Sequence, residues 1–294
     1  MNRLTANTLP KSLFALSSIL ILLFASVVQA EVKKTATEKA FVQAMLAKGS
    51  VKCLSPPPMD KTMHQQGMDS DRNGANAAMF FSTTNHIIKT GLDGKVLALA
   101  SVKYHHGDLT YHDGKVYVAA EFGTMNKPGD VDDSWVYVYD AKDLSLVAKH
   151  PVPEVLYGIG GIAYHDGKFV AVGGLPHEVK ENHLTVYDKD FKFIEHKVIP
   201  GHTFLGIQSA AYHNGYWWFG CYGKTNPIVL QVDESFNLVN IADIDFALGM
   251  VGLTEGEFLL GGWWASAKVR HITPSDLSKR KKVMKAKEAK AKTR

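Results

Sequence analysis

Short apolar runs separated by polar turns cover the chain between residues 64 and 275. In residues 160–199 four such runs follow one another, and the first two are joined by the turn His165-Asp166-Gly167. The four runs are 160–164, 168–174, 184–187 and 193–199. Apolar runs of this length bounded by Asp-Gly turns are typical of β-strands joined by hairpins. The pattern predicts four strands here, and no long helical period competes with it.

This four-strand unit is repeated along the chain. Tyr111-His112-Asp113-Gly114, Tyr164-His165-Asp166-Gly167 and Tyr212-His213-Asn214-Gly215 are equivalent, with divergent copies around Gly74 and Gly256. The five turn glycines are spaced by 40, 53, 48 and 41 residues. Units of about 40–45 residues with four strands are typical of propeller blades. The sequence therefore predicts an all-β, five-bladed β-propeller of four-stranded antiparallel blades, with a short helix before it and a basic tail after it.

The blade pattern resembles that of bacterial exported propellers, in the broad sense of the gluconolactonase and senescence-marker group. The resemblance covers the repeated blades and includes no specific family motif. It implies the propeller fold and does not carry an activity across.

The last unit is one strand short, because the chain turns into a lysine run soon after Ile272. Propellers avoid an exposed sheet edge by borrowing a strand from the other terminus. Ser50–Ser55 is the only strand-like segment before the first unit, so we expect it to close the ring. Residues 36–48, with Phe41 and Met45, predict an amphipathic helix that caps one end of the barrel.

The N-terminus has the features of a signal peptide. Arg3 and Lys11 precede an apolar run at 13–28, and a small-residue cleavage pattern ends at Ala30. A membrane-spanning helix is the alternative, although the run is short for a span. The predicted domains are a signal peptide at 1–30, a helix and closing strand at 31–63, the propeller at 64–277 and a basic tail at 278–294. The predicted location is secreted or periplasmic.

Cysteine usage and charge add two further expectations. Cys53 and Cys221 are the only cysteines, and they could form a disulfide or stay as two buried thiols. Residues 279–294 carry nine Lys or Arg against Glu288 alone, while the whole chain has a net charge of +4. Such a tail is expected either to bind an anionic surface or to be a solvated terminus. Without aromatic residues among the lysines, specific nucleic-acid binding is not expected.

The candidate binding face follows from where the units differ. Both long insertions, 122–134 and 175–183, fall between second and third strands, and length variation confined to one face often marks the binding face. Segments entering the innermost strands open on the same face, at the channel mouth. A small molecule or glycan is the expected partner of a monomeric chain. The predicted ligand-binding residues are His64, Gln66, His106, Asp108, Glu121, Tyr157 and Gln208.

Two structural interpretations oppose these choices. The polar residues at the mouth could simply bind the loops between blades. The repeated His112, His165 and His213 are expected to bind their own turns. In addition, adjacent His105 and His106 point to opposite sides of an extended strand, so only one can face the channel.

A metal site is a further candidate. Asp69, Asp71 and Asn73 place oxygen side chains at every second residue before a turn glycine, as at the start of a calcium loop. Phe80 stands where the complete loop needs Glu, so an ordinary first hairpin is the competing interpretation. A second acidic loop contains Asp130, Asp132 and Asp133. A divalent metal ion, calcium or zinc, is the one cofactor that the sequence offers.

Two functions remain compatible with these residues. The first is an exported propeller that binds a ligand or envelope partner through its channel-mouth face. The alternative is a metal-dependent hydrolase or lyase of the lactonase-like type. The sequence does not name the substrate or decide whether the protein is an enzyme.

Overall fold

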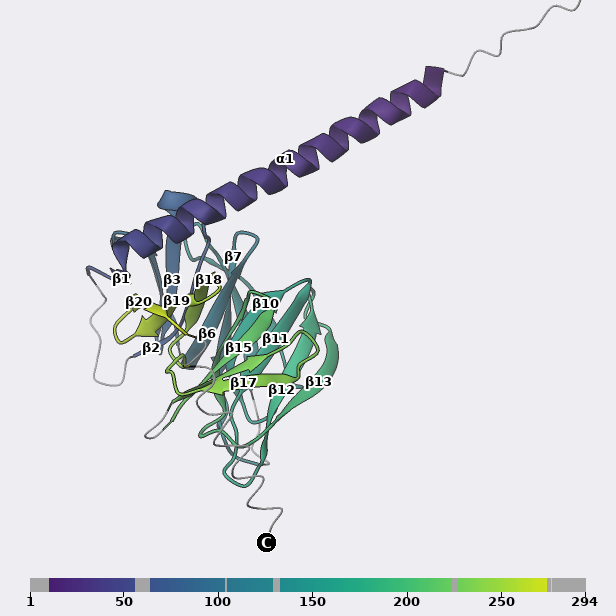
Figure 1. The fold of residues 1–294 in the computed structure, drawn as a ribbon. Helices are drawn as coiled ribbons and strands as arrows, with labels where there is room; N and C mark the ends of the chain where they lie inside the picture. The colour runs from purple at the N-terminus through teal and green to yellow at the C-terminus, as the bar shows by residue number, and fades with distance from the viewer. Residues whose placement is uncertain are drawn as a thin grey trace, which may run out of the picture.

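The chain folds as a ring of five four-stranded antiparallel sheets, seen from the side in Figure 1, with the innermost strand of each sheet next to that of its neighbours. This confirms the predicted fold class. The computed structural model describes residues 11–55, 64–103, 105–128, 133–223, 227–273 and 276, with only the backbone described for 11–28 and 30. The predicted basic tail lies outside the described residues. The boundaries predicted for the domains stay predictions.

Blades one to four are each formed by four strands that follow one another along the chain. The innermost strand comes first, and the outermost strand comes last. Blade one contains β2 (Gln65–Ser70), β3 (Ala78–Thr83), β4 (His86–Gly91) and β5 (Val96–Ser101). Blade two contains β6 (His105–His112), β7 (Lys115–Glu121), β8 (Ser134–Asp140) and β9 (Leu146–Pro151). Blade three contains β10 (Ile159–His165), β11 (Lys168–Gly173), β12 (Glu181–Asp188) and β13 (Phe193–Pro200).

Blade four contains β14 (Ile207–His213), β15 (Tyr216–Cys221), β16 (Ile228–Val232) and β17 (Leu238–Ala242). Blade five contains β18 (Met250–Thr254), β19 (Glu257–Gly262) and β20 (Ser266–His271), together with β1 (Ser50–Lys52) from the N-terminal part. Because the strands alternate in direction, the ring has two distinct sides. We call the side with the first hairpin turn of each blade the turn side, and the opposite side, with the two long insertions, the insertion side.

The repeated turns have the geometry that their sequence predicts. Asp113, Asp166 and Asn214 have φ values of 46°, 46° and 52°, and the glycine after each of them also has a positive φ. Two consecutive positive φ values define the tight hairpin turn that matches strand twist, and Asp-Gly and Asn-Gly favour it. The repeat is therefore a set of hairpins between the two innermost strands of blades two, three and four.

The ring closes as predicted, through a strand borrowed from the N-terminal part. β1 pairs antiparallel with β20, with Val51 opposite Ala267. Val51 is 2% exposed, so the short strand also contributes to the core. This pairing covers the edge of β20 that would otherwise be open.

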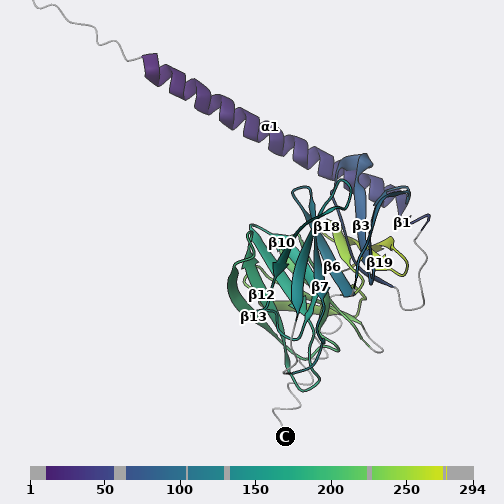
Figure 2. The same cartoon turned by 180° about the vertical axis from the view of Figure 1, so that it is seen from behind.

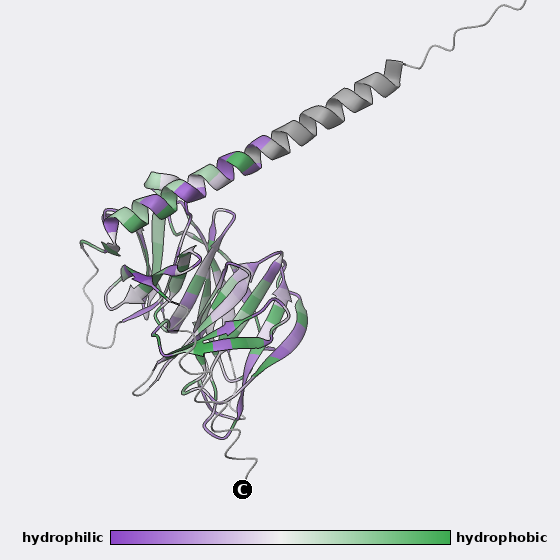
Figure 3. Cartoon of the chain, viewed as in Figure 1, coloured by the Kyte–Doolittle hydropathy of each residue, from purple (hydrophilic) through white to green (hydrophobic). Residues whose placement is uncertain are grey.

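A helix precedes the closing strand. α1 (Lys11–Lys48) includes the predicted helix at 36–48 and continues toward the N-terminus. It lies across the turn side near β3 and β18 and extends beyond the blades in both views (Figures 1 and 2). Phe41 and Met45 are fully buried, while Ala47 is exposed. Hydrophobic and hydrophilic residues alternate along its described part (Figure 3), so one face docks and the other meets solvent.

The membrane alternative concerns the same helix. In the described part of the chain, no helix combines the length and hydropathy needed to cross a bilayer. The signal peptide and the predicted export stay predictions.

Five hydrophobic clusters fill the gaps between neighbouring blades, one cluster for each gap. The gap between blades five and one also takes Phe41 and Met45 from α1 and Val51 from β1. Cys53 belongs to this cluster, and Cys221 belongs to the one between blades three and four. Both cysteines are buried free thiols, so the structure agrees with the expectation of two thiols and not with that of a disulfide.

Candidate functional site

The predicted site residues are divided among three levels of the channel. His64, Gln66, Glu121, Tyr157 and Gln208 lie toward the insertion side. Asp108 lies inside the channel, and Asp69, Asp71 and Asn73 lie at the turn side. The structure therefore does not bring the predicted set together in one place.

A compact polar group forms at the insertion-side mouth. His64 Nε2 lies 3.2 Å from Gln66 Nε2 and 3.4 Å from the Tyr222 hydroxyl. The Tyr222 hydroxyl is also 3.5 Å from Gln66 Oε1. Gln66 is buried at 3% exposure, whereas His64 and Tyr222 are half-buried. We call His64, Gln66 and Tyr222 the mouth triad.

Two tryptophans beside the mouth triad are exposed to solvent. Trp263 is 61% exposed and Trp264 is 40% exposed, and the His64 and Trp263 ring centroids are 5.4 Å apart. Both tryptophans lie in the turn between β19 and β20. Trp264 and Ala265 have φ values of 69° and 48°, which are unfavourable for residues with a side chain.

This turn is fixed by hydrogen bonds to its surroundings. The Ser266 amide donates to Gln65 Oε1 at 2.8 Å, and the Cys53 amide donates to the Ala265 carbonyl at 3.0 Å. Gln65 is completely buried and also donates to the Leu248 carbonyl at 2.8 Å. The strained turn is therefore held by groups from blade one and from the closing segment.

His105 and His106 point in different directions, as the strand geometry requires. His106 Nε2 lies 3.1 Å from the Tyr139 hydroxyl, and its ring packs edge-on against Tyr137. His106 is therefore inside the blade and away from the mouth triad. The pKa of His105 depends on residues near the mouth. Burial lowers this pKa most, the charge of His64 lowers it further, and Glu121 acts in the opposite direction.

Glu121 organises the loops around the mouth. Its Oε1 accepts hydrogen bonds from the Gly123 and Asp133 amides, at 2.7 and 3.1 Å. Its Oε2 accepts from the Ser134 hydroxyl at 2.5 Å and from the Ile159 amide at 2.9 Å. Both oxygens thus join the insertion of blade two to blade three. This agrees with the alternative in which the polar residues at the mouth bind the loops between blades.

Tyr157 and Gln208 also hold loops on the insertion side. The Gln208 side chain donates to the Leu205 carbonyl at 2.7 Å. The Tyr157 carbonyl accepts from the Asn126 amide at 3.1 Å, and Asn126 Oδ1 accepts from the Leu175 amide at 2.9 Å. Asn126 thereby ties the two insertions together. Sequence reasoning missed it, because nothing in the repeat marks a residue that occurs once inside an insertion.

Asp108 closes the channel between its two ends. The carboxylate Oδ2 accepts a hydrogen bond of 2.8 Å from the Ala210 amide, which belongs to blade four. Around it, a Cβ on Gly67 would lie 2.0 Å from Asp108 Oδ1, and one on Gly161 would lie 3.2 Å from Asp108 Cβ. One side chain thus contacts three other blades. At 1% exposure it is a buried group within β6.

The environment of Asp108 strongly affects its charge. Burial raises its pKa well above the usual range of a carboxyl, while hydrogen bonds from backbone amides, Ala210 first, act in the opposite direction. Asp69 adds to the increase as a second carboxylate nearby. A neutral carboxyl is therefore favoured at the centre of the ring.

Asp71 binds the backbone of its own hairpin, and Asp69 binds both its own strand and blade two. Asp71 Oδ1 accepts from the Asn73 and Ala78 amides, at 3.1 and 2.9 Å. Asp69 accepts from the Ser70 and Tyr111 amides, at 2.8 and 2.7 Å. Among the described residues no three His, Cys, Asp or Glu side chains are grouped to hold a metal ion. These contacts fit the hairpin interpretation, and Asp130 and Asp132 lie outside the described residues.

The repeated histidines act between blades. The His112 ring stacks on Tyr164 with centroids 3.7 Å apart, and His165 stacks on Tyr212 at 3.3 Å. His213 Nε2 contacts the Thr254 carbonyl of blade five at 2.6 Å. Each histidine therefore joins its blade to the next one, whereas the sequence predicted a bond to its own turn.

No family model matches the chain, and no curated protein sequence matches it. The computationally designed Ika4 protein is 12% identical, with 66% of this chain and 96% of that chain covered and a TM-score of 0.37. A protein of unknown function from Bacteroides caccae is 13% identical, with 71% and 74% covered and a TM-score of 0.46. Saccharomyces cerevisiae Sqt1 is 10% identical, with 71% and 59% covered and a TM-score of 0.38.

These likenesses concern the fold alone. They do not name the gluconolactonase and senescence-marker group, so that resemblance stays a prediction. The chain is a five-bladed β-propeller, a fold consistent with a binding role.

Proposed function

We propose that this propeller binds a glycan or a similar polyhydroxylated molecule at the insertion-side mouth. The observation that carries the proposal is the exposed indole of Trp263 beside the mouth triad of His64, Gln66 and Tyr222. A large exposed aromatic ring next to a half-buried polar group is typical of binding surfaces.

The two parts of this surface match the two parts of a sugar ring. A pyranose has an apolar face of C–H groups, which can lie on an indole, and a rim of hydroxyls. The mouth triad offers an imidazole, a carboxamide and a phenol, which can both donate and accept hydrogen bonds. A few polar groups placed beside an apolar surface give orientation and specificity in small-molecule sites.

The strained turn supports the same function. Trp264 and Ala265 keep left-handed backbone conformations that cost on the order of 1–3 kcal/mol for each residue. Neither Trp263 nor Trp264 recovers this cost by burial. Hydrogen bonds to Gln65 and Cys53 hold the turn in this strained conformation. A role in presenting the two indoles to a ligand explains why the strain is kept.

A glycan array probed with the chain starting at Glu31 tests this proposal. Binding to a subset of glycans is expected, and Trp263→Ala or Gln66→Ala should weaken it at least tenfold. Leu97→Ala is the matched control, since Leu97 is 55% exposed on an outer strand. If no glycan binds, or if Trp263→Ala binds as the unaltered protein does, the proposal is wrong.

The metal-dependent hydrolase or lyase is the alternative, and it requires a stoichiometric ion. Metal analysis of the purified protein decides between the two functions: one bound ion whose removal leaves the fold intact would favour the enzyme.

The proposal also includes export and an anchor. We expect the chain to be secreted or periplasmic as a monomer, with residues 279–294 attached to an anionic surface. Truncation after Ser278 should abolish low-salt binding to anionic vesicles without changing the melting temperature, because lysine attraction is screened by salt. Vesicle binding that survives the truncation would rule out this anchor.

A further inference from the structure

A second hollow lies at the opposite end of the channel. It is a cavity of about 170 Å³ on the turn side, and the inner strands of all five blades line it. Asp108 accepts a hydrogen bond from the amide of Ala210, one of the residues that line the cavity. Residues of α1 border a neighbouring, more open hollow, and the two hollows share Asp71, Arg72 and Tyr111.

Two of the blades that line the cavity depart from the repeat. Tyr111, Tyr164 and Tyr212 each pair with the second residue of the strand that follows. At the same position blade one has Ser70 and blade five has Gly252. A ring of tyrosines thus lacks two adjacent members. The His213 ring takes the place beside Gly252, so only the position of Ser70 has no large side chain in it.

Blade one also contributes a carboxylate, that of Asp69, to the lining of the cavity. Asp69 occupies the position that holds Thr110, Ala163 and Ala211 in the next three blades. The Thr110 hydroxyl donates to Asp69 Oδ2 at 3.2 Å, beside the Tyr111 amide at 2.7 Å. Asp69 is recessed yet partly accessible, and burial raises its pKa while Arg72 acts against the increase.

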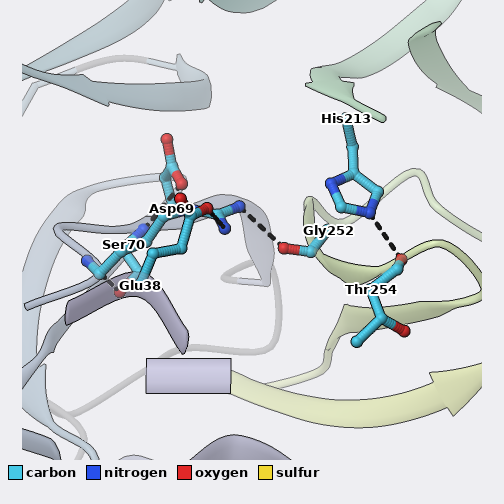
Figure 4. A network of polar contacts seen from close by, with 7 residues as sticks. Glu38, Asp69, Ser70, His213, Gly252 and Thr254 are labelled. Carbon is cyan, nitrogen blue, oxygen red and sulfur yellow. Dashed lines mark hydrogen bonds and ion pairs between the residues drawn. The ribbon is translucent and has the colours of Figure 1, made fainter. Parts of the chain in front are cut away.

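The nearest cation is already paired. Arg72 donates to Glu38 of α1 at 3.0 Å and to the Gly252 carbonyl at 2.8 Å, across the gap between blades one and five (Figure 4). Glu38 therefore balances the charge of Arg72. Among the residues that line the cavity itself, two carboxylates, Asp69 and Asp71, therefore stand against Arg72 alone, while Lys33 and Lys34 border the neighbouring hollow.

We propose that the turn-side cavity binds a small organic ammonium compound, with the ammonium group donating hydrogen bonds to Asp69. A cavity of about 150 Å³ holds a molecule as large as benzene, so a cation of several heavy atoms fits. A desolvated carboxylate gains most from a ligand that brings both positive charge and N–H donors. This site is independent of the glycan site at the mouth.

An organic cation suits the cavity better than an anion or a bare metal ion. An anion would face two carboxylates. A metal ion would need several oxygen or nitrogen ligands, and the described residues contain no group of three acidic, His or Cys side chains for it. An ammonium group needs only one carboxylate and nearby oxygens.

Calorimetric titration tests the proposal with alkylammonium ions from methyl- to hexylammonium and with the alcohols of equal chain length. We expect one-to-one binding of ammonium ions and at least tenfold weaker binding of the alcohols. Asp69→Asn should weaken ammonium binding at least tenfold. Asp190→Asn is the matched control, because it removes one carboxylate from an exposed turn.

Ala211→Leu provides a variant that fills the cavity without changing its charge, since Ala211 lines it. It should abolish ammonium binding while thermal unfolding remains cooperative, and Trp263→Ala should leave ammonium binding unchanged. The proposal is overturned if no ammonium ion binds, if the alcohols bind as tightly, or if Asp69→Asn and Ala211→Leu bind like the unaltered protein. If Asp69→Asn does not fold, the Ala211→Leu result decides.

Discussion

The two ends of the channel are built from the same strands but in different ways. At the turn side the repeated Tyr-His pairs stack from one blade to the next, as His112 does on Tyr164. At the insertion side single-copy residues such as Glu121 and Asn126 join loops of unequal length. The repeat therefore supplies packing between blades, and residues outside the repeat supply chemistry. The turn side follows the same rule, because its cavity lies where blades one and five break the repeat.

Removing the helix contact at the turn side should have the largest effect. Phe41→Ala deletes a fully buried ring from the cluster that blades five and one share with α1. We expect a loss of about 3–5 kcal/mol in the free energy of unfolding, the usual cost of deleting a buried Phe side chain. Val32→Ala is the control, since Val32 is 65% exposed on the same helix. Equal denaturant midpoints for the two variants would show that the helix does not stabilise the propeller.

On the insertion side the strongest single test is Glu121→Ala. It removes both acceptor oxygens of a carboxylate with four hydrogen bonds. The buried Ser134 hydroxyl loses this acceptor, and the Ile159 amide keeps only Ser134 Oγ, at 3.2 Å. We expect a loss of about 2–4 kcal/mol, because each buried donor left without a partner costs about 1–3 kcal/mol. Chemical denaturation measures the loss. A change below 0.5 kcal/mol, about what a surface substitution gives, would mean that the loops do not depend on Glu121.

Asp108 separates the two ends, and its titration should appear in the pH dependence of stability. Its pKa is raised in the folded state, so the folded protein holds the proton more tightly than the unfolded chain does. Stability should therefore fall as pH rises from about 3.9, the ordinary Asp pKa, through the raised value. The slope due to this group is at most about 1.4 kcal/mol per pH unit.

Unfolding curves recorded from pH 4 to pH 9 for the unaltered protein and for Asp108→Asn measure that contribution. The asparagine variant should show the flatter profile. Parallel profiles would mean that Asp108 does not change its protonation in the folded protein.

The smallest expected effect concerns one stacked pair of the repeat. His165→Ala removes the ring that lies on Tyr212 and should cost about 0.5–1.5 kcal/mol, the range for aromatic pairs beyond their buried area. Binding at either end of the channel should not change. A variant with normal stability but without glycan binding would move the function to the turn-side histidines.

Much of the architecture could be predicted because it follows from local chemistry. The Asp-Gly and Asn-Gly turns, the spacing of Gly74 to Gly256 and the missing last strand each have a direct structural meaning. The site could be predicted only in part. Strand alternation shows that His105 and His106 diverge, but it does not show which of them points away from the mouth.

Contacts across the ring lie beyond such reasoning. Asp108 meets the Ala210 amide from a blade two positions away, and Arg72 meets Glu38 of α1. Neither pair shares a strand, a turn or a period in the sequence. The turn-side cavity likewise depends on the register of the strands, which places Ser70 and Gly252 at the positions that hold tyrosines in the other blades.

The closure of the ring by β1 has a consequence for the order of folding. Val51 pairs with Ala267, so one of the first strands of the propeller to leave the ribosome finds its partner only after the last strand has been made. Hairpins within a blade join neighbours and close quickly, whereas contacts between distant residues form slowly. Blade-one residues of the same cluster, such as Phe81, are made soon after Phe41 and Met45, but the side of the cluster that blade five covers stays open until its strands are synthesised. During that interval the chain depends on slow collapse or on a bound chaperone to avoid aggregation.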